Sequence, residues 1–325
     1  MMSPSDWKVP PSAQPKPQGY SYDLERALSS VMGLSATVPT DAFTADTLGT
    51  ERAGNAVLIR EDGIVLTIGY LVTEAETVWL TLSDGRVAPG HVIGIDGETG
   101  FGLVQVLARL DLPALPLGRS SATKVGDPVV IGGAGGRRRS VAGRIAMKQE
   151  FAGYWEYVLE DAIFTAPAHP HWGGTALIGA DGHLLGIGSL QLQQERSPDR
   201  AEHLNMIVPI DVLKPILDDM LRLGQADRPA RPWLGVFATE VDGRVAVAGV
   251  ARGGPAESAG LQLGDLVLEV AGRPVADLAG FFRAAWALGP AGVKVPMKLH
   301  REGRSLDATV HSVDRRKLLK GPVVH

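Results

Sequence analysis

The sequence predicts a mainly β protein with a large N-terminal domain of short strands and a smaller C-terminal domain. Its 325 residues are enough for two or three domains, each with its own core. The 40 glycines and 22 prolines favour a turn-rich chain over a helical one. Between Gly54 and residue 192, short apolar runs alternate with turn signals, a pattern typical of a β-sandwich or a barrel.

The composition excludes several kinds of site. With no cysteine, the chain has no disulfide, no thiolate nucleophile and no cysteine-ligated metal. A net charge of -4 gives no general attraction to nucleic acid or to an anionic membrane. His169 and His171 are a close pair without a third ligand, so no metal is expected. The glycine-rich stretch 132–140 has neither a Walker lysine nor a dinucleotide fingerprint, and no cofactor is expected either.

The two ends of the chain are polar. Residues 1–24 are rich in proline, serine, glutamine and lysine and are expected to form a flexible arm. The basic tail 314–325 is expected to be frayed. Since no apolar run is long enough for a signal peptide or a membrane span, we expect a cytoplasmic location, or a periplasmic one if the N-terminus is truncated.

The large domain is expected over residues 25–224. Residues 24–34 fit a short amphipathic helix or an extended lead-in. Residues 54–67 and 77–96 each read as strand, turn, strand, with the hairpin turn of the second at Asp84-Gly85. Near the end of the domain, Asp211 is a plausible N-cap for a helix that ends at Gly224.

A second domain is expected over residues 233–313. The polar, proline-containing stretch 225–232 is typical of a domain linker. Several strands follow, with one helix expected over residues 277–288.

The second domain resembles the PDZ domain of the HtrA/Deg protease family through Pro-Trp-Leu-Gly-Val (232–236) and GGPAESAGLQLGDLVLEVAGRPV (253–275). A hydrophobic-Gly-hydrophobic loop before an edge strand can hold the terminal carboxylate of a peptide on its backbone N–H groups. The resemblance implies a peptide groove between this loop, the strand after it and one helix face. The expected groove residues are Trp233, Leu234, Gly235, Val236, Phe237, Phe281, Ala285 and Leu288.

The large domain resembles the trypsin-like protease domain of the same family. Residues 54–67 resemble the first hairpin, 115–136 the stretch before the regulatory loop, and 203–220 the last strand and closing helix. The resemblance implies a trypsin-like double six-stranded β-barrel followed by an α+β PDZ domain.

The triad positions implied by this resemblance hold other residues. Tyr70 stands where the family has its histidine, and Gly100 where it has its aspartate. Gly173 stands in the serine position, and a shift of one residue would place Trp172 there instead. Tyrosine is a poor general base at neutral pH, and glycine has no side chain. The sequence therefore predicts vacant triad positions, no catalytic residues and a protein that is not an enzyme.

The resulting hypothesis is a non-proteolytic HtrA/Deg-like pseudoprotease that binds peptide or protein C-termini as an adaptor, chaperone-like or regulatory subunit. Tyr20 and Tyr22 lie where the family places aromatic side chains between subunits, so we expect a homo-oligomer (a trimer), or a mixed oligomer with an active homologue. One alternative is an active serine endopeptidase with an unrecognised catalytic arrangement. Another is a structural subunit whose PDZ groove is filled by charged or bulky residues.

Overall fold

The computed structural model describes residues 7–197 and 200–321, which form two compact units. The first unit takes in the described residues up to Gln149, then Asp161–Asp227 and the chain from Lys320. The second unit comprises Arg228–Leu319 together with a separate segment, Glu150–Glu160. The second unit is therefore built from two stretches that are far apart in the sequence.

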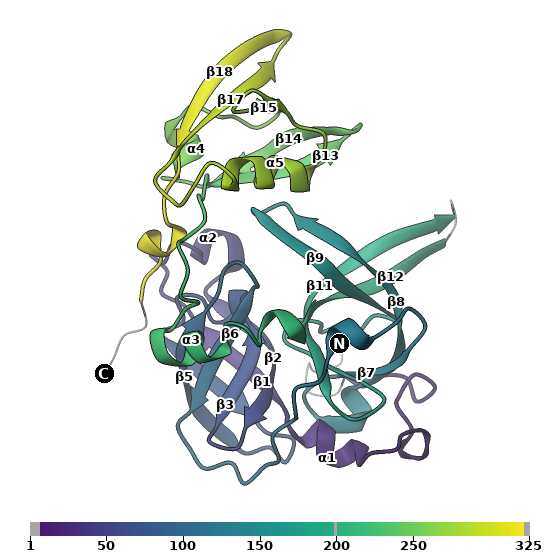
Figure 1. Cartoon of the computed structure of the whole chain (residues 1–325). Coiled ribbons are helices and arrows are strands. Elements are labelled where there is room, and N and C mark those ends of the chain that lie inside the picture. The colour runs from purple at the N-terminus through teal and green to yellow at the C-terminus, as the bar shows by residue number, and fades with distance from the viewer. Residues whose placement is uncertain (1–6, 198–199, 322–325) are drawn as a thin grey trace. The chain divides into compact units, whose positions relative to one another are not determined.

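The first unit begins with a six-stranded closed barrel in the order β1-β2-β3-β6-β5-β4 (Figure 1). Its strands are β1 (Val31–Thr37), β2 (Glu51–Arg60), β3 (Ile64–Ile68), β4 (Thr77–Thr81), β5 (Val87–Ile95) and β6 (Phe101–Val106). The barrel closes because β1 pairs with both β2 and β4. The turn between β4 and β5 contains Gly85 at φ 87°, a conformation that favours glycine, as the Asp84-Gly85 signal predicts.

A second closed barrel follows, in the order β10-β11-β12-β9-β8-β7. Its strands are β7 (Pro128–Gly132), β8 (Val141–Gly153), β9 (Tyr157–Ala166), β10 (Ala176–Ile178), β11 (Leu184–Ser197) and β12 (Arg200–Pro209). The short helices of the first unit are α1 (Leu24–Ser29), α2 (Ala45–Leu48) and α3 (Leu217–Leu223). The side chain of Asp23 caps α1 by accepting a hydrogen bond from the backbone N–H of Arg26.

The N-terminal segment differs from the expected flexible arm. Val9 is 3% exposed and joins the core of the second barrel, against which Trp7 and Ala13 also pack. The Val9 N–H donates to the Arg138 carbonyl, and the Ala142 N–H donates to the Ala13 carbonyl. Apolar burial and these hydrogen bonds hold residues that composition alone assigned to an arm. Residues 1–6 of the expected arm lie outside the described chain.

Two further expectations differ in detail. Asp211 does not cap α3, which begins only after Ile216, because Pro215 interrupts the preceding turn. Asp211 instead bonds Lys214 and the N–H of Ser121. In the expected frayed tail, Arg315–Leu318 forms a 3-10 helix, and the Lys320 N–H donates to Glu74. Residues 322–325 lie outside the described chain.

The second unit contains a sheet in the order β13-β14-β15-β17-β18, with β16 paired to β15. The bounds are β13 (Val236–Val241), β14 (Arg244–Val250), α4 (Pro255–Ser258), β15 (Leu266–Val270), β16 (Arg273–Pro274), α5 (Leu278–Trp286), β17 (Lys294–Arg301) and β18 (Arg304–His311). Asp277 caps α5 through the N–H of Gly280, and Phe281 and Phe282 pack fully buried in the core of this unit.

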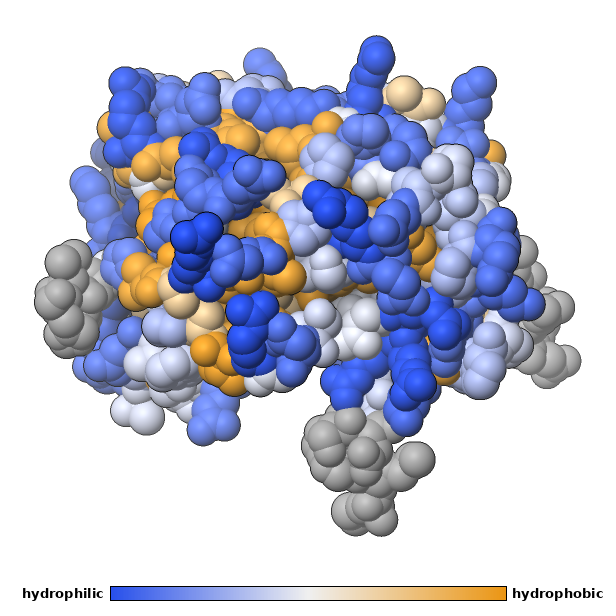
Figure 2. All heavy atoms as spheres, turned by 90° about the horizontal axis from the view of Figure 1, so that it is seen from below, coloured by the Kyte–Doolittle hydropathy of each residue, from blue (hydrophilic) through white to orange (hydrophobic). Residues whose placement is uncertain are grey.

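The surface is polar with apolar side chains between the charged ones, as Figure 2 shows for the face seen from below. Exposed apolar residues include Trp79 and Val87, which lie on the paired strands β4 and β5. The two barrels and the α+β unit confirm the expected fold class.

Candidate functional site

A cleft of about 460 Å³ lies in the first unit, between residues of the two barrels. Asn55 and Tyr70 come from the first barrel, and the loop from His169 to Gly173 comes from the second. Trp7, from the N-terminal segment, also lines this cleft. The structure therefore brings the expected histidine and serine positions to one cavity.

Tyr70 and Gly173 face one another closely. A Cβ added at Gly173 would lie 2.7 Å from the Tyr70 hydroxyl oxygen. That hydroxyl donates to the carbonyl of Ser189 at 2.9 Å. Burial raises the pKa of Tyr70 well above its usual range, so the phenol stays protonated at neutral pH and acts as a hydrogen-bond donor.

Gly100 lies beside the residue that precedes Tyr70. Its carbonyl accepts a hydrogen bond from the Gly69 N–H at 2.6 Å, and its own φ is 83°. Gly100 thus lies beside the residue before Tyr70, and Gly173 faces the Tyr70 hydroxyl, but neither glycine has a side chain. These three residues do not supply a hydroxyl nucleophile, an imidazole and a carboxylate. Their equivalence to the triad positions of the family stays a prediction.

Asn55 organises the loop that carries Gly173, and sequence reasoning missed it. Its Nδ2 donates to the carbonyls of His171 and Gly173, both at 2.9 Å. Its Oδ1 accepts the N–H of Ala134 at 2.8 Å. Asn55 is 4% exposed, and a polar side chain next to the apolar run 56–59 was the available signal.

His169 is buried and neutral. Its Nδ1 accepts the N–H of His171 at 3.1 Å, and its Nε2 lies 2.7 Å from the Arg139 carbonyl, which therefore accepts from Nε2–H. Burial lowers the pKa of His169 to about 4. The Trp7 ring meets His169 and His171 edge-on, with centroids 5.5 and 4.7 Å away. Both ring nitrogens of His169 are thus engaged within the chain.

The expected peptide groove lies in the second unit, where its residues differ in burial. Leu234, Val236, Phe281 and Ala285 are buried in the core. Trp233, Phe237 and Leu288 are half-buried. Gly235 has a φ of 75°, a left-handed conformation that favours glycine. This turn directs the N–H groups of residues 234–236 toward one acceptor.

The acceptor is the carboxylate of Glu156, from the hairpin between β8 and β9. The N–H groups of Leu234, Gly235 and Val236 donate to Glu156 Oε1 at 3.1, 2.7 and 3.0 Å, and Leu234 also reaches Oε2 at 3.0 Å. Burial raises the pKa of Glu156 to about 7, although these hydrogen bonds and Arg315 act in the opposite direction. Sequence reasoning missed Glu156, because nothing local links residue 156 to the loop.

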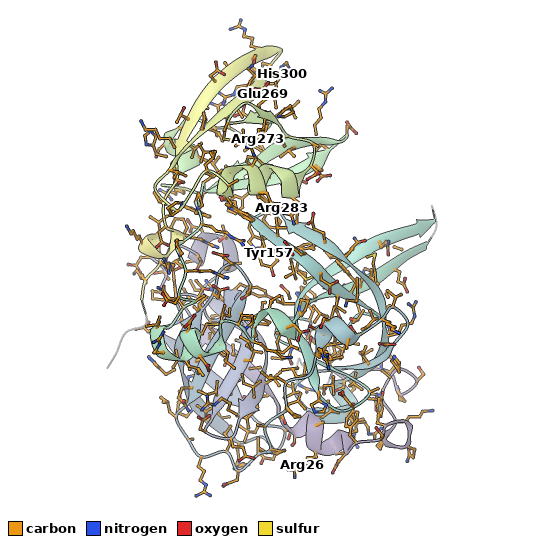
Figure 3. All side chains as sticks on the ribbon, viewed as in Figure 1. Arg26, Tyr157, Glu269, Arg273, Arg283 and His300 are labelled. Carbon is orange, nitrogen blue, oxygen red and sulfur yellow. The ribbon has the colours of Figure 1, made fainter. Side chains whose placement is uncertain are left out.

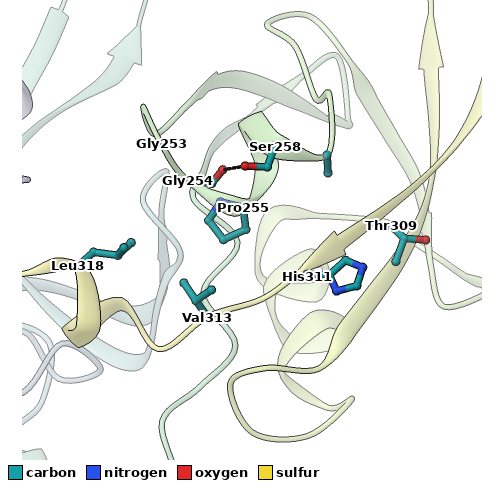
Figure 4. Close-up of a pocket in the computed structure, with 9 residues that line it drawn as sticks. Gly253, Gly254, Pro255, Ser258, Thr309, His311, Val313 and Leu318 are labelled. Carbon is teal, nitrogen blue, oxygen red and sulfur yellow. Dashed lines mark hydrogen bonds between the residues drawn. The ribbon is translucent and has the colours of Figure 1, made fainter.

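A second cavity of about 370 Å³ lies in the same unit beside α4 and β18 (Figure 4). Gly253, Pro255 and His311 are among its lining residues. The Ser258 hydroxyl at its edge donates to the Gly254 carbonyl at 3.1 Å. None of the expected site residues lines this cavity.

Comparisons with known proteins match both domains. A family profile described as "Trypsin-like peptidase domain" matches residues 54–187, and one described as "PDZ domain" matches residues 232–311. A probable periplasmic serine endoprotease DegP-like of Pseudomonas fulva is 30% identical over 266 residues, covering 77% of this chain and 53% of the relative. Serine endoprotease DegS of Salmonella typhimurium is 24% identical over 331 residues, covering 93% of this chain and 90% of the relative.

Solved structures share the fold. HtrA-type protease AlgW with a decapeptide has a TM-score of 0.52 and 24% identity, over 92% of this chain and 98% of that one. A serine endoprotease from Yersinia pestis has a TM-score of 0.51 and 20% identity, over 90% and 96% of the two chains. The chain spans about half the length of the DegP-like relatives.

These findings correct two expectations. The expectation that the chain is not an enzyme is contradicted, because its relatives are named serine endoproteases and its fold is that of a protease. The cytoplasmic location is not supported, since several relatives are named periplasmic. Across residues 7–197 and 200–321, none of the helices combines the length and apolarity needed to cross a membrane. The two profile matches support a trypsin-like peptidase domain followed by a PDZ domain, and the chain is similar to DegP-like and HtrA-type proteases.

Proposed function

We propose that this chain binds the C-terminal segments of peptides or proteins through its PDZ domain. The observation that carries the proposal is the convergence of the three N–H groups of residues 234–236 on a single carboxylate. A peptide's terminal carboxylate has the same two acceptor oxygens as the Glu156 carboxyl group that lies there. The loop is therefore a carboxylate-binding site whatever the source of the carboxylate.

The strand after the loop supplies the rest of the recognition. β13 pairs with β14 on one edge, and on the other the N–H of Ala238 donates to the Tyr154 carbonyl, outside the sheet. An extended peptide can take that hydrogen bond by adding a strand to the sheet. Backbone pairing supplies affinity, and the terminal carboxylate fixes the register.

The test is a binding titration with paired peptides of identical sequence, one with a free C-terminal carboxylate and one amidated. We expect the free acids to bind at least about 10-fold more tightly, because each hydrogen bond to a charged group contributes roughly 1.5–3 kcal/mol. Equal affinity for the two forms would refute carboxylate recognition. The ligand is varied rather than the loop, because Leu234 is fully buried and a polar substitution there would disrupt the core.

Serine endopeptidase activity is the second candidate, favoured by the names of the relatives. Since positions 70, 100 and 173 hold tyrosine and two glycines, hydrolysis would need a catalytic arrangement made by other residues. A fluorophosphonate probe and casein cleavage test this directly. Labelling of one serine, with cleavage that persists through repurification, is the expected result for an endopeptidase. The absence of both labelling and cleavage would rule out endopeptidase activity.

We also propose that the chain assembles into a homo-oligomer, or a mixed oligomer with an active homologue. We propose the periplasm as its location, because several relatives are named periplasmic. The Tyr20 and Tyr22 rings lie 5.5 Å apart, and Tyr22 packs on Gly182 of the same chain. Light scattering tests the assembly, and a monodisperse monomer at working concentration would contradict it.

A further inference from the structure

The tip of the β8–β9 hairpin belongs to the same compact unit as the PDZ domain. Residues Glu150–Glu160 cluster with Arg228–Leu319, while the rest of both strands belongs to the first unit. Within this unit, the tip contacts β13 through the Ala238 N–H, which donates to the Tyr154 carbonyl. The hairpin tip therefore lies in the place where the resemblance predicts a bound peptide.

The hairpin follows the register of a peptide ligand. The N–H of Ala238, two residues beyond the loop, donates to the carbonyl of Tyr154 at 2.9 Å. Glu156, two residues after Tyr154, fills the loop with its carboxylate. The segment runs toward the loop while β13 runs away from it, so the two are antiparallel. A peptide with a terminal carboxylate would make the same set of contacts.

The backbone at the tip is shaped for this contact. Glu156 has a φ of 63°, the left-handed region in which a residue other than glycine is uncommon. That conformation reverses the chain at the end of the tip and lets the glutamate side chain, rather than the main chain, reach the loop. Positions of backbone strain often mark functional contacts.

Other contacts hold the tip against the PDZ domain. Ala152 and Val158 pack against its core, and the Tyr154 ring lies 6.0 Å from that of Phe237. From α5, Arg283 forms an ion pair with Glu150 and lies 4.0 Å from Glu160. Arg283 and Tyr157, which stands on the hairpin, are both labelled in Figure 3. These contacts cover β13 around Phe237 and Ala238, where an external ligand would pair with the strand.

We propose that residues 150–160 are a built-in ligand of the PDZ domain, and that an external peptide with a free terminal carboxylate binds by displacing Glu156 from the loop. This inference rests on the proposed peptide-binding function and states how access to that site is regulated. Because the hairpin is part of the same chain as the PDZ domain, it competes with an external peptide at a high effective concentration.

The fraction of molecules in which the hairpin occupies the loop determines how strongly it lowers the apparent affinity for an external peptide. The apparent affinity for an external ligand falls in proportion to the fraction of molecules whose loop is open. If the hairpin occupies the loop in at least nine molecules out of ten, its removal raises the affinity by about 10-fold or more. A structural role for the hairpin without competition predicts no such gain.

The experiment compares the full chain with Glu156→Ala and with Glu302→Ala as a matched control. Glu302 also lies at a hairpin tip of this unit at positive φ (48°), but it is exposed and makes no bond to the loop. The probe is a fluorescein-labelled decapeptide ending in Gly-Tyr-Trp-Val, as free acid and as amide. We expect Glu156→Ala to bind the free acid about 10-fold more tightly or better, and Glu302→Ala to bind it as the unaltered protein does.

Hydrogen exchange gives a second readout that needs no peptide. In Glu156→Ala the amides of Leu234, Gly235 and Val236 are expected to exchange faster than in Glu302→Ala. Equal exchange in both variants overturns the built-in ligand. Equal peptide affinity in the unaltered protein and Glu156→Ala also overturns it, while leaving peptide binding intact. Faster exchange without binding of any peptide would instead refute the proposed function and the displacement step.

Discussion

The contact between Tyr70 and Gly173 gives a sharp test of the cleft geometry. A methyl group introduced by Gly173→Ala would place its carbon 2.7 Å from the Tyr70 hydroxyl oxygen, closer than van der Waals contact allows. Overpacking of this kind typically costs about 1–3 kcal/mol. Gly173 is not at positive φ, so steric contact alone accounts for the expected cost.

Tyr70→Phe removes the oxygen involved in this clash. It also deletes the hydrogen bond to the Ser189 carbonyl, so by itself it should cost about 1–3 kcal/mol. The double variant should lose much less than the sum of the two single losses. We expect a coupling energy of roughly 1–2 kcal/mol in the direction of relief.

Urea unfolding followed by tryptophan fluorescence measures these free energies, with Trp172 beside both positions in the cleft. Gly97→Ala is the control, because a Cβ there meets nothing within 4 Å. It should change the free energy of unfolding by no more than about 0.5 kcal/mol. If Gly173→Ala costs no more than Gly97→Ala, or if the cycle is additive, positions 70 and 173 are not in the contact described.

Three further predictions follow from buried titratable groups. Because the pKa of His169 is lowered to about 4, the unfolded chain binds the extra proton, and stability should fall by roughly 3 kcal/mol between pH 6.5 and 4; His169→Gln should flatten that slope in unfolding curves. Asp265 is fully buried and paired with Arg301, whose side chain is 26% exposed. Arg301→Met, which strands a buried carboxylate, should therefore destabilise more than Asp265→Asn by thermal unfolding. The raised pKa of Glu156 means that the docked hairpin binds its proton more tightly than the released one. Docking should weaken as pH rises from about 4.5 through 7, so free-acid peptides should bind better at pH 8 than at pH 5.5, and a profile unchanged by Glu156→Ala would contradict this.

Local signals predicted much of the backbone. The alternating apolar runs and turn residues indicate the strands, and Gly235 and Asp277 mark the carboxylate loop and the start of α5. These features depend on backbone preferences that each residue carries with it, so a single sequence is enough to find them. The prediction of a helix that begins directly after Asp211 was wrong. The apolar spacing there favours a helix, but Pro215 interrupts the turn, and α3 begins only at Leu217.

Contacts between distant segments were decided only by the tertiary structure. The sequence shows Tyr70, Gly100 and Gly173, but only barrel closure and the packing of the two barrels place the tyrosine hydroxyl against residue 173 and make Asn55 the clamp of its loop. The resemblance predicts a carboxylate-binding loop at residues 234–236, yet its occupant, Glu156, lies 78 residues from Leu234. The sequence by itself therefore determined which segments are strands and turns, and the carboxylate-binding loop stays a prediction from the resemblance. The tertiary structure decided what meets that loop, because contact between remote segments depends on how the whole chain packs and not on local preference.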